Sequence, residues 1–304
     1  MDQSLNVFVT VAEKKNFSRA AEELHMTQPA VSQYIRSLEE TMDVRLLERT
    51  NKYVRLTKAG EIVYHHAKEI VGLYGRMHHL VNDLSHEASG QLSIGASYTF
   101  GEYVLPHILA RLLEIYPLIK PDVRIGNTAE IADLIMSRQL DVGIVEGRFK
   151  ENRQLTAQAF AEDQMILIAS AKHPLTLKEG AINWQRLAEQ TWIIREEGSG
   201  TREAVEAVFD RYSISPVRSM QFSSTQPIKE AVEAGLGISL LSKWAVQKEI
   251  RYGDLVQLPV EGLPFIRQFS IVTSSQYQTK ALKVFLELLL NNRELTLFRK
   301  SNGI

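Results

Sequence analysis

Residues 16–38 read NFSRAAEELHMTQPAVSQYIRSL, and this stretch predicts two short helices joined by a tight turn. The hydroxyl of Ser18 can cap the first of these helices. Thr27 is a good N-cap for the second, which carries Pro29 in its first turn, where a missing N–H costs little. The residues before this stretch have the spacing of a further amphipathic helix, with apolar side chains at Leu5, Phe8, Val9 and Ala12.

The helix that begins after Thr27 has an apolar stripe and a polar face. Val31, Ile35 and Leu38 recur at helical spacing. The polar and cationic side chains of the other face are Gln28, Ser32, Gln33 and Arg36. Two helices joined by a short turn, the second with an exposed polar face, are typical of a helix-turn-helix. A plain helical bundle with one solvated face is the alternative that this pattern alone leaves open.

Residues 49–58 favour DNA binding over the plain bundle. They contain four cations and no acid, and their turn residues and alternation predict a small hairpin. A basic hairpin beside a polar recognition helix forms a wing that is suited to phosphate oxygens. We therefore expect phosphate contacts from Arg49, Lys52 and Arg55.

The first sixty residues resemble the N-terminal domain of LysR-type transcriptional regulators. The matching runs are residues 8–9, 16–21, 24–32, 35–39, 46–49 and 56–60. The chain departs from that pattern at Asp43, where a glycine is usual, and at Leu47, where a phenylalanine is usual. Because Asp tolerates the left-handed conformation better than most residues, we expect the turn to be kept. The resemblance implies a winged helix-turn-helix over residues 1–57, with DNA contacts from Ser18, Gln28, Pro29, Ser32, Gln33, Arg36, Arg49, Lys52 and Arg55.

A long helix follows, which Thr57 can cap and which we expect to continue to about Ser89, so that residues 58–89 form a linker helix. Apolar residues at alternating steps of four and three make a coiled-coil seam: Val63, Ala67, Ile70, Tyr74, Met77, Val81, Leu84 and Ala88. A helix of about 30 residues spans roughly 45 Å, more than one small domain covers, so we expect it to pair with the same helix of a second subunit. A core helix packed on its own chain is the alternative. Its four histidines (His65, His66, His78 and His79) include no i, i+4 pair, so no metal site is expected.

Residues 90–304 alternate short β-branched runs with helical runs, which predicts an α/β domain around a mostly parallel sheet. Hydroxyl-rich loops precede helices at residues 97–99, 127–129, 198–202 and 224–226. Free N–H groups at helix N-termini favour anions, and such loops can converge on one cleft in a two-lobed protein. The expected effector site comprises Ser97, Tyr98, Thr99, Asn127, Thr128, Gly198, Ser199, Thr201, Arg202, Thr225 and Gln226.

Two points about this expected site stay open. The loop at residues 198–202 could simply cap a helix. Arg195 and Arg202 are candidate charge partners of the anion, but they could instead pair with Glu196, Glu197 or surface acids. Hydroxyl and N–H groups can hold an oxyanion without either arginine.

Residues 90–293 resemble the effector domain of LysR-type regulators, which has the fold of type 2 periplasmic binding proteins. The matching motifs are at residues 92–95, 140–144 and 234–238, and Arg138 stands where glycine is usual. The run at residues 195–202 is most similar to regulators of sulfur or carbon assimilation. The resemblance implies lobe I at about 90–161 and 269–304, and lobe II at about 162–268.

Composition excludes several classes of protein. The 304 residues carry 35 Lys and Arg against 36 Asp and Glu, so DNA binding must come from a local patch. The absence of cysteine excludes disulfides, cysteine-ligated zinc and a thiol nucleophile. With no signal peptide at the start and no apolar run of about 18 residues, we expect a cytoplasmic protein without membrane contact.

The expected function is a ligand-responsive transcription regulator that binds promoter DNA as a homodimer or homotetramer and responds to a small anionic effector. No cofactor, metal or catalytic residue is expected. One alternative is an enzyme with a helical N-terminal extension and catalysis near Ser199 or the Glu196/Glu197 pair. Another is a DNA-architectural protein with a ligand-free C-terminal domain.

Overall fold

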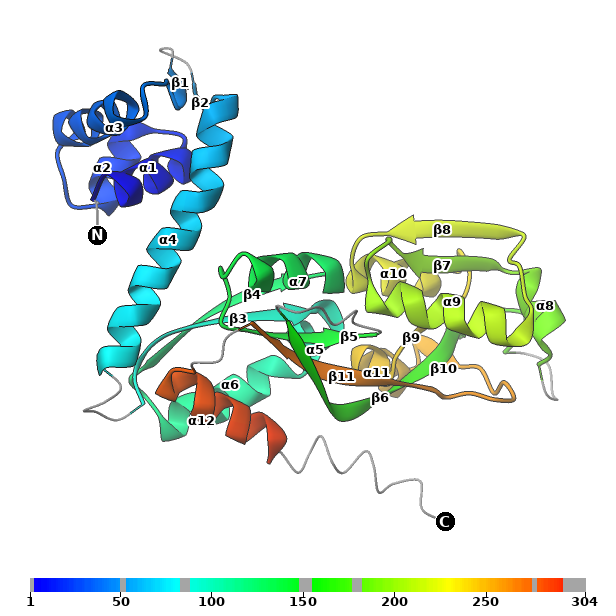
Figure 1. Ribbon diagram of the computed structural model, residues 1–304. Coiled ribbons are helices and arrows are strands. Elements are labelled where there is room, and N and C mark those ends of the chain that lie inside the picture. The colour runs from blue at the N-terminus through cyan, green and yellow to red at the C-terminus, as the bar shows by residue number, and fades with distance from the viewer. Residues whose placement is uncertain are drawn as a thin grey trace. The chain divides into compact units, whose positions relative to one another are not determined.

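The computed structural model describes residues 3–49, 53–82, 88–147, 155–176, 182–274 and 278–291. The chain divides into an N-terminal unit, Met1–Ser85, and a C-terminal unit, His86–Ile304 (Figure 1). Each unit has hydrophobic cores of its own. None of the described helices combines the length and the apolar character that a membrane span requires.

The N-terminal unit is a winged helix-turn-helix followed by a long helix. Its core forms where α1 packs against α2, α3 and α4, with Phe8, Val31 and Ile35 fully buried. The predicted hairpin is confirmed, since its two strands pair antiparallel from Leu47 opposite Leu56 to Arg49 opposite Val54. The elements are α1 (Gln3–Lys14), α2 (Phe17–Glu23), α3 (Gln28–Met42), β1 (Leu47–Arg49), β2 (Val54–Leu56) and α4 (Lys58–Asn82).

The ends of α2 and α3 test the local predictions. The prediction of Ser18 as a cap is wrong: α2 begins earlier, and Asn16 caps it by accepting a hydrogen bond from the backbone N–H of Arg19 at 3.0 Å. Asn is as strong a cap as Ser, and its amide oxygen reaches the third helical residue. Thr27 occupies the cap position of α3 without a side-chain capping bond. Asp43 adopts the expected left-handed conformation (φ 51°, ψ 33°) and ends α3.

Glu39 of α3 positions the hairpin. Its Oε1 accepts hydrogen bonds from the backbone N–H groups of Leu46 (2.8 Å) and Leu47 (3.2 Å). Thr57 Oγ1 donates to the carbonyl of Arg45 at 2.8 Å and accepts from the N–H of Gly60 at 2.9 Å, so it caps α4 as predicted. A Cβ at Gly60 would lie 2.0 Å from the carbonyl oxygen of Leu46, so only glycine permits this approach.

The exposed side chains of α4 differ in part from the predicted seam. Ala67 is buried in the core of its own unit, so it is not available to a partner. Ile70 and Met77 are 46% and 50% exposed, and the exposed Leu73 lies between them. The predicted helix end is too late, because Ala88 is not helical and packs in the core of the C-terminal unit. The side chain of Val81 and the whole of Leu84 lie outside the described residues.

The C-terminal unit is built on a seven-stranded sheet with the order β10-β6-β11-β5-β3-β4, and β9 also pairs with β6. β3 is parallel to β4 and β5, but β6 pairs antiparallel with β9, β10 and β11, so the prediction of a mostly parallel sheet is only partly correct. The strands are β3 (Gly90–Ser97), β4 (Ile119–Gly126), β5 (Val142–Glu146), β6 (Thr156–Ser170), β9 (Ser239–Ser242), β10 (Leu255–Gln257) and β11 (Phe265–Thr273).

Two lobes share this sheet, and the long strands β6 and β11 run from one lobe to the other (Figure 1). Within β6, Ala161 belongs to the core of lobe I and Met165 to that of lobe II. Lobe I holds β3, β4 and β5 with α5 (Tyr98–Tyr103), α6 (Leu105–Ile115), α7 (Thr128–Met136) and α12 (Lys280–Leu290). Lobe II holds β9, β10 and the parallel pair β7 (Thr191–Arg195) and β8 (Arg218–Phe222), with α8 (Trp184–Ala188), α9 (Gly200–Tyr212), α10 (Thr225–Glu233) and α11 (Lys243–Tyr252).

Replacing Glu39 should destabilise the N-terminal unit. Glu39→Ala leaves two partly buried backbone N–H groups without their acceptor, which should lower the free energy of unfolding by about 1–3 kcal/mol. Urea denaturation measures this loss. Glu40→Ala, an exposed change in the same helix, is the matched control and should lower it by less than about 0.5 kcal/mol. Equal losses in the two variants would contradict the role given to Glu39.

Candidate functional site

The outward face of α3 carries the residues predicted to contact DNA. Gln28, Pro29, Gln33 and Arg36 are exposed, and Ser32 is half-buried. Gln28 donates a hydrogen bond from Nε2 to the hydroxyl of Ser32 at 2.9 Å. The apolar stripe of the same helix is buried in the unit's core, so this polar face is the one that remains free for a ligand.

The hairpin adds a cation beside this face. Arg55 of β2 is exposed, and its guanidinium lies 4.8 Å from the ring centroid of Tyr53. Arg49 ends β1, but its side chain and the whole of Lys52 lie outside the described residues. Ser18 is exposed on α2. Because Glu39 hydrogen-bonds the backbone at the start of the hairpin, the hairpin is held in a fixed position relative to α3.

A second polar site lies between the lobes of the C-terminal unit and centres on Arg267 of β11. This side chain is only 5% exposed. Its NH1 donates to the hydroxyl of Thr201 at 2.9 Å and its NH2 to that of Thr99 at 3.0 Å. Thr99 is at the start of α5 in lobe I and Thr201 at the start of α9 in lobe II. Two of the predicted hydroxyl loops therefore meet, from different lobes, at one buried guanidinium.

Two buried carboxylates complete the surroundings of Arg267. Its Nε donates to Asp163 at 2.7 Å, and its NH2 to Glu146 at 3.1 Å. Both carboxylate residues are 1% exposed, and the hydroxyl of Ser242 also donates to Asp163 at 2.6 Å. Burial raises the pKa of Glu146, while the charge of Arg267 opposes this shift.

Arg267, Glu146 and Asp163 are not among the residues predicted from the sequence. Arg267 faces Asp163 across the β6–β11 pair, and Glu146 ends β5. The one signal in the sequence was an ionisable residue at an inward position of each strand. Such a position predicts a buried charge but does not identify its partners.

Further contacts hold the lobes together beside this cluster. The N–H of Ala129 in lobe I donates to the carbonyl of Gly198 in lobe II at 3.2 Å, and Asn127 Nδ2 donates to Glu196 Oε1 at 3.3 Å. A Cβ at Gly200 would lie 1.9 Å from the carbonyl oxygen of Glu146. The start of α9 therefore lies directly against the end of β5, and the lobes are closed.

The two arginines proposed as charge partners already have carboxylate partners. Arg195 is 1% exposed and forms a two-point ion pair with Glu196, 2.7 Å at both nitrogens. It also stacks 4.3 Å from the ring centroid of Tyr98 and donates to Thr225 at 3.4 Å. Arg202 pairs with Glu206 at 2.5 Å. The alternative of pairing with acids thus holds for both arginines in this closed state.

The remaining predicted effector residues have local roles in the closed state. Ser199 Oγ accepts from the N–H of Thr201, so this loop does cap its helix. Thr128 donates to the carbonyl of Glu146 at 2.9 Å, and Ser97 to that of Ile144 at 3.4 Å. Gln226 is exposed and donates to Glu230 of its own helix at 2.8 Å.

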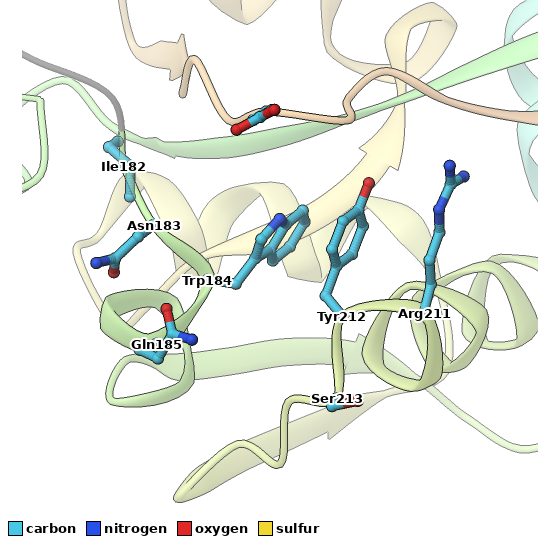
Figure 2. A pocket seen from close by; sticks show the side chains of 8 residues that line it. Ile182, Asn183, Trp184, Gln185, Arg211, Tyr212 and Ser213 are labelled. Atoms are coloured by element: carbon cyan, nitrogen blue, oxygen red, sulfur yellow. The ribbon is translucent and has the colours of Figure 1, made fainter.

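A separate pocket of about 450 Å³ lies on lobe II, and Figure 2 shows the side chains that line it. The rings of Trp184 and Tyr212 stack with centroids 4.1 Å apart, and Arg211 lies 5.6 Å from the centroid of Tyr212. None of the predicted site residues lines this pocket. The lining residues are Ile182, Asn183, Trp184, Gln185, Arg211, Tyr212, Ser213 and Glu261.

Within the described part of the chain, no group of three or more His, Asp or Glu side chains is arranged to hold a metal ion.

Comparison with known proteins covers both units. The family model "Bacterial regulatory helix-turn-helix protein, lysR family" matches residues 3–61, and the model "LysR substrate binding domain" matches residues 85–294. The chain is 36% identical to the HTH-type transcriptional regulator CysL of Bacillus subtilis, over 97% of this chain and 98% of that protein. It is 35% identical to the RuBisCO operon transcriptional regulator of Allochromatium vinosum, over 89% of this chain and 88% of that protein.

A solved structure supports the fold of the C-terminal unit. The regulatory domain of CcmR from Synechocystis PCC6803, in complex with 2-PG, matches with a TM-score of 0.61 and 28% identity, over 71% of this chain and 100% of that one. The matches to regulators over nearly the whole chain exclude the alternative of an enzyme with catalysis near Ser199. The chain belongs to the LysR family of bacterial transcription regulators and is a DNA-binding regulator with a C-terminal effector domain.

Proposed function

We propose that this regulator binds a small anionic effector between the two lobes of its C-terminal unit and that this binding alters how it engages promoter DNA. The observation that carries the proposal is the meeting of Thr99 and Thr201, from different lobes, at the buried guanidinium of Arg267. Hydroxyls, helix N-termini and a guanidinium are the groups that bind oxyanions. The relative CcmR binds 2-PG in its regulatory domain, which supports a small-molecule effector here.

The effector would act by favouring one arrangement of the lobes. A ligand shifts a conformational equilibrium only by as much as it binds one state better than the other. An anion that contacts both Thr99 and Thr201 is bound fully only when the lobes are closed. Beside these two residues and Arg267, the proposed site retains Ser97, Tyr98, Asn127, Thr128, Gly198, Ser199, Arg202 and Thr225, with Gln226 at its edge.

On DNA, α3 would enter the major groove and the hairpin would contact the backbone. The exposed Gln28, Gln33 and Arg36 are long enough to reach base edges. The exposed Arg55 is placed for phosphate oxygens, and we assign the same role to Arg49 and Lys52. We place this regulator in the cytoplasm, the compartment in which bacterial regulators of this family meet the chromosome.

The exposed stripe of α4 would pair with a second copy. Ile70, Leu73 and Met77 recur at helical spacing and are exposed in the single chain. Exposed apolar stripes of this kind are covered by a partner helix. LysR-type proteins form oligomers, and we propose that the contact between subunits is centred on these three residues, of which Ile70 and Met77 belong to the predicted seam and Leu73 does not. The chain would thus act as a homodimer or a homotetramer.

Arg36→Ala should lose sequence preference. A base contact contributes about 1–3 kcal/mol, so binding to a duplex site selected from a random pool should weaken about tenfold, with little change on random duplex. Fluorescence anisotropy measures both affinities. Arg55→Ala is the control: it should weaken both equally and lower the salt slope of log K by about one. Equal losses on the two duplexes in Arg36→Ala would reduce Arg36 to a phosphate contact.

Ile70→Glu should favour monomers, because it places an unpaired carboxylate in an apolar contact between subunits. Ile70 is exposed in the single chain, so the variant should still fold. Sedimentation velocity gives the oligomeric state. Gly72→Glu puts the same charge on the opposite side of α4 and should assemble like wild type. Wild-type assembly of the Ile70 variant would contradict the proposed seam.

Thr201→Val keeps the side-chain volume and removes the hydroxyl that faces Arg267. A hydrogen bond to a charged group contributes about 1.5–3 kcal/mol, so anion affinity should fall by about tenfold or more. Thermal-shift titration of the full chain with inorganic phosphate, sulfate and 2-PG reports this loss. Thr156→Val, an exposed change on β6, is the control. The affinity of Thr201→Val for DNA in the absence of effector should not change. Wild-type anion affinity in both Thr201→Val and Ser97→Ala would place the effector elsewhere.

A further inference from the structure

The interlobe cluster contains more carboxylates than cations. Arg267 carries one positive charge, whereas Glu146 and Asp163 are two acids in direct contact with it. Arg195, a further cation whose charge acts on Glu146, is already paired with Glu196. An anion that enters this cluster therefore meets an excess of negative charge if both acids are ionised.

Glu146 is the acid that an incoming anion would displace. It shares the NH2 group of Arg267 with the hydroxyl of Thr99, and its bond to that nitrogen is the longer of the two carboxylate bonds (3.1 Å against 2.7 Å). Asp163 has a donor at each oxygen, Ser242 at Oδ1 and Arg267 at Oδ2. An anion seated between Thr99 and Thr201 would compete with Glu146 for NH2.

A displaced Glu146 cannot remain ionised beside the anion at low cost. An ionised carboxylate only accepts hydrogen bonds, and an oxyanion without a proton also only accepts them. Glu146 is 1% exposed, so its carboxylate and an anion in contact with it would be shielded from water. Their like charges would repel each other strongly there. One proton between them turns this repulsion into a hydrogen bond, which is short and strong because one partner is charged.

We propose that Glu146 makes the interlobe cleft selective for oxyanions that bring a proton near neutral pH, such as hydrogen phosphate, and against oxyanions that have none, such as sulfate. This inference rests on the proposed anion site. Phosphate keeps at least one proton near neutral pH and can donate it to Glu146. Sulfate has none to donate, so it binds only when Glu146 itself takes up a proton. Glu146 is thus a specificity-determining residue of the cleft.

The groups that face Glu146 agree with this role. Charged neighbours come from four elements: Arg267 of β11, Asp163 of β6, Arg195 of β7 and Glu203 of α9, whose carboxylate lies next to Gly147. Thr99 of α5 adds a hydrogen bond. Burial, the largest influence, raises the pKa of Glu146, and Asp163 raises it further, so the carboxyl accepts a proton more readily than an exposed one.

The test compares inorganic phosphate with sulfate on the full-length chain by isothermal titration calorimetry at pH 8 and equal ionic strength. Wild type should bind phosphate at least about tenfold more tightly than sulfate, the ratio that one buried hydrogen bond to a charged group supplies. Glu146→Gln has the same shape, no charge and an N–H that can donate to sulfate, so its sulfate affinity should rise by about tenfold or more. Glu197→Gln removes the same charge from an exposed position of the nearby loop and should keep the wild-type preference.

Equal affinity of wild type for the two anions, or an unchanged preference in Glu146→Gln, would overturn the inference. If neither anion binds wild type or the variant, the proposed anion site itself is wrong. A second measurement needs no variant: the sulfate affinity of wild type should rise as the pH falls, by up to about tenfold per unit, because each sulfate takes up one proton. A sulfate affinity independent of pH between 6 and 8 would also overturn the inference.

Discussion

The C-terminal unit depends on the burial of one guanidinium. Arg267 is removed from water, so each of its donors needs an acceptor within the protein. Thr99 and Glu146 belong to lobe I, while Thr201 belongs to lobe II. The lobes cannot separate without leaving these buried donors unpaired or admitting water to them. The hydrogen bonds of Arg267 and the closure of the lobes therefore form and break together. Because of this coupling, a ligand that binds in the cleft can shift the arrangement of the lobes.

In the N-terminal unit, too, one charged side chain holds two parts of the fold together through hydrogen bonds. The carboxylate of Glu39 holds two backbone N–H groups at the start of the hairpin, so the wing keeps its position beside α3. The face that remains exposed combines amides, a serine and a guanidinium, which can read base edges and phosphates together. Ile70 and Met77 are exposed in the single chain, and in the proposed dimer they would form the contact that holds two such faces at a set spacing.

Local sequence patterns predicted the helices, the hairpin and the turns. They did not predict which side chains from distant parts of the chain would meet. The apolar stripe of α3, the hairpin and the left-handed turn at Asp43 depend on neighbours within a few residues, so the sequence alone indicated them. The cap of α2 was misassigned because Asn16 and Ser18, two residues apart, are both residue types that cap helices. The cluster around Arg267 was missed because its partners come from strands far apart along the chain. Arg267 meets Asp163 only through the register of β6 and β11, which no local pattern contains.

Hydrogen exchange at the amide of Ala129 reports whether Arg267 holds the two lobes closed. That amide donates to the carbonyl of Gly198 across the lobes, so it is protected only while they are closed. Arg267→Met removes the shared donors and puts an unbranched apolar side chain in the place of the guanidinium. Faster exchange over residues 127–131 is expected in this variant, with no change in β3 of the lobe I core. Equal exchange over residues 127–131 in wild type and variant would contradict this role of Arg267.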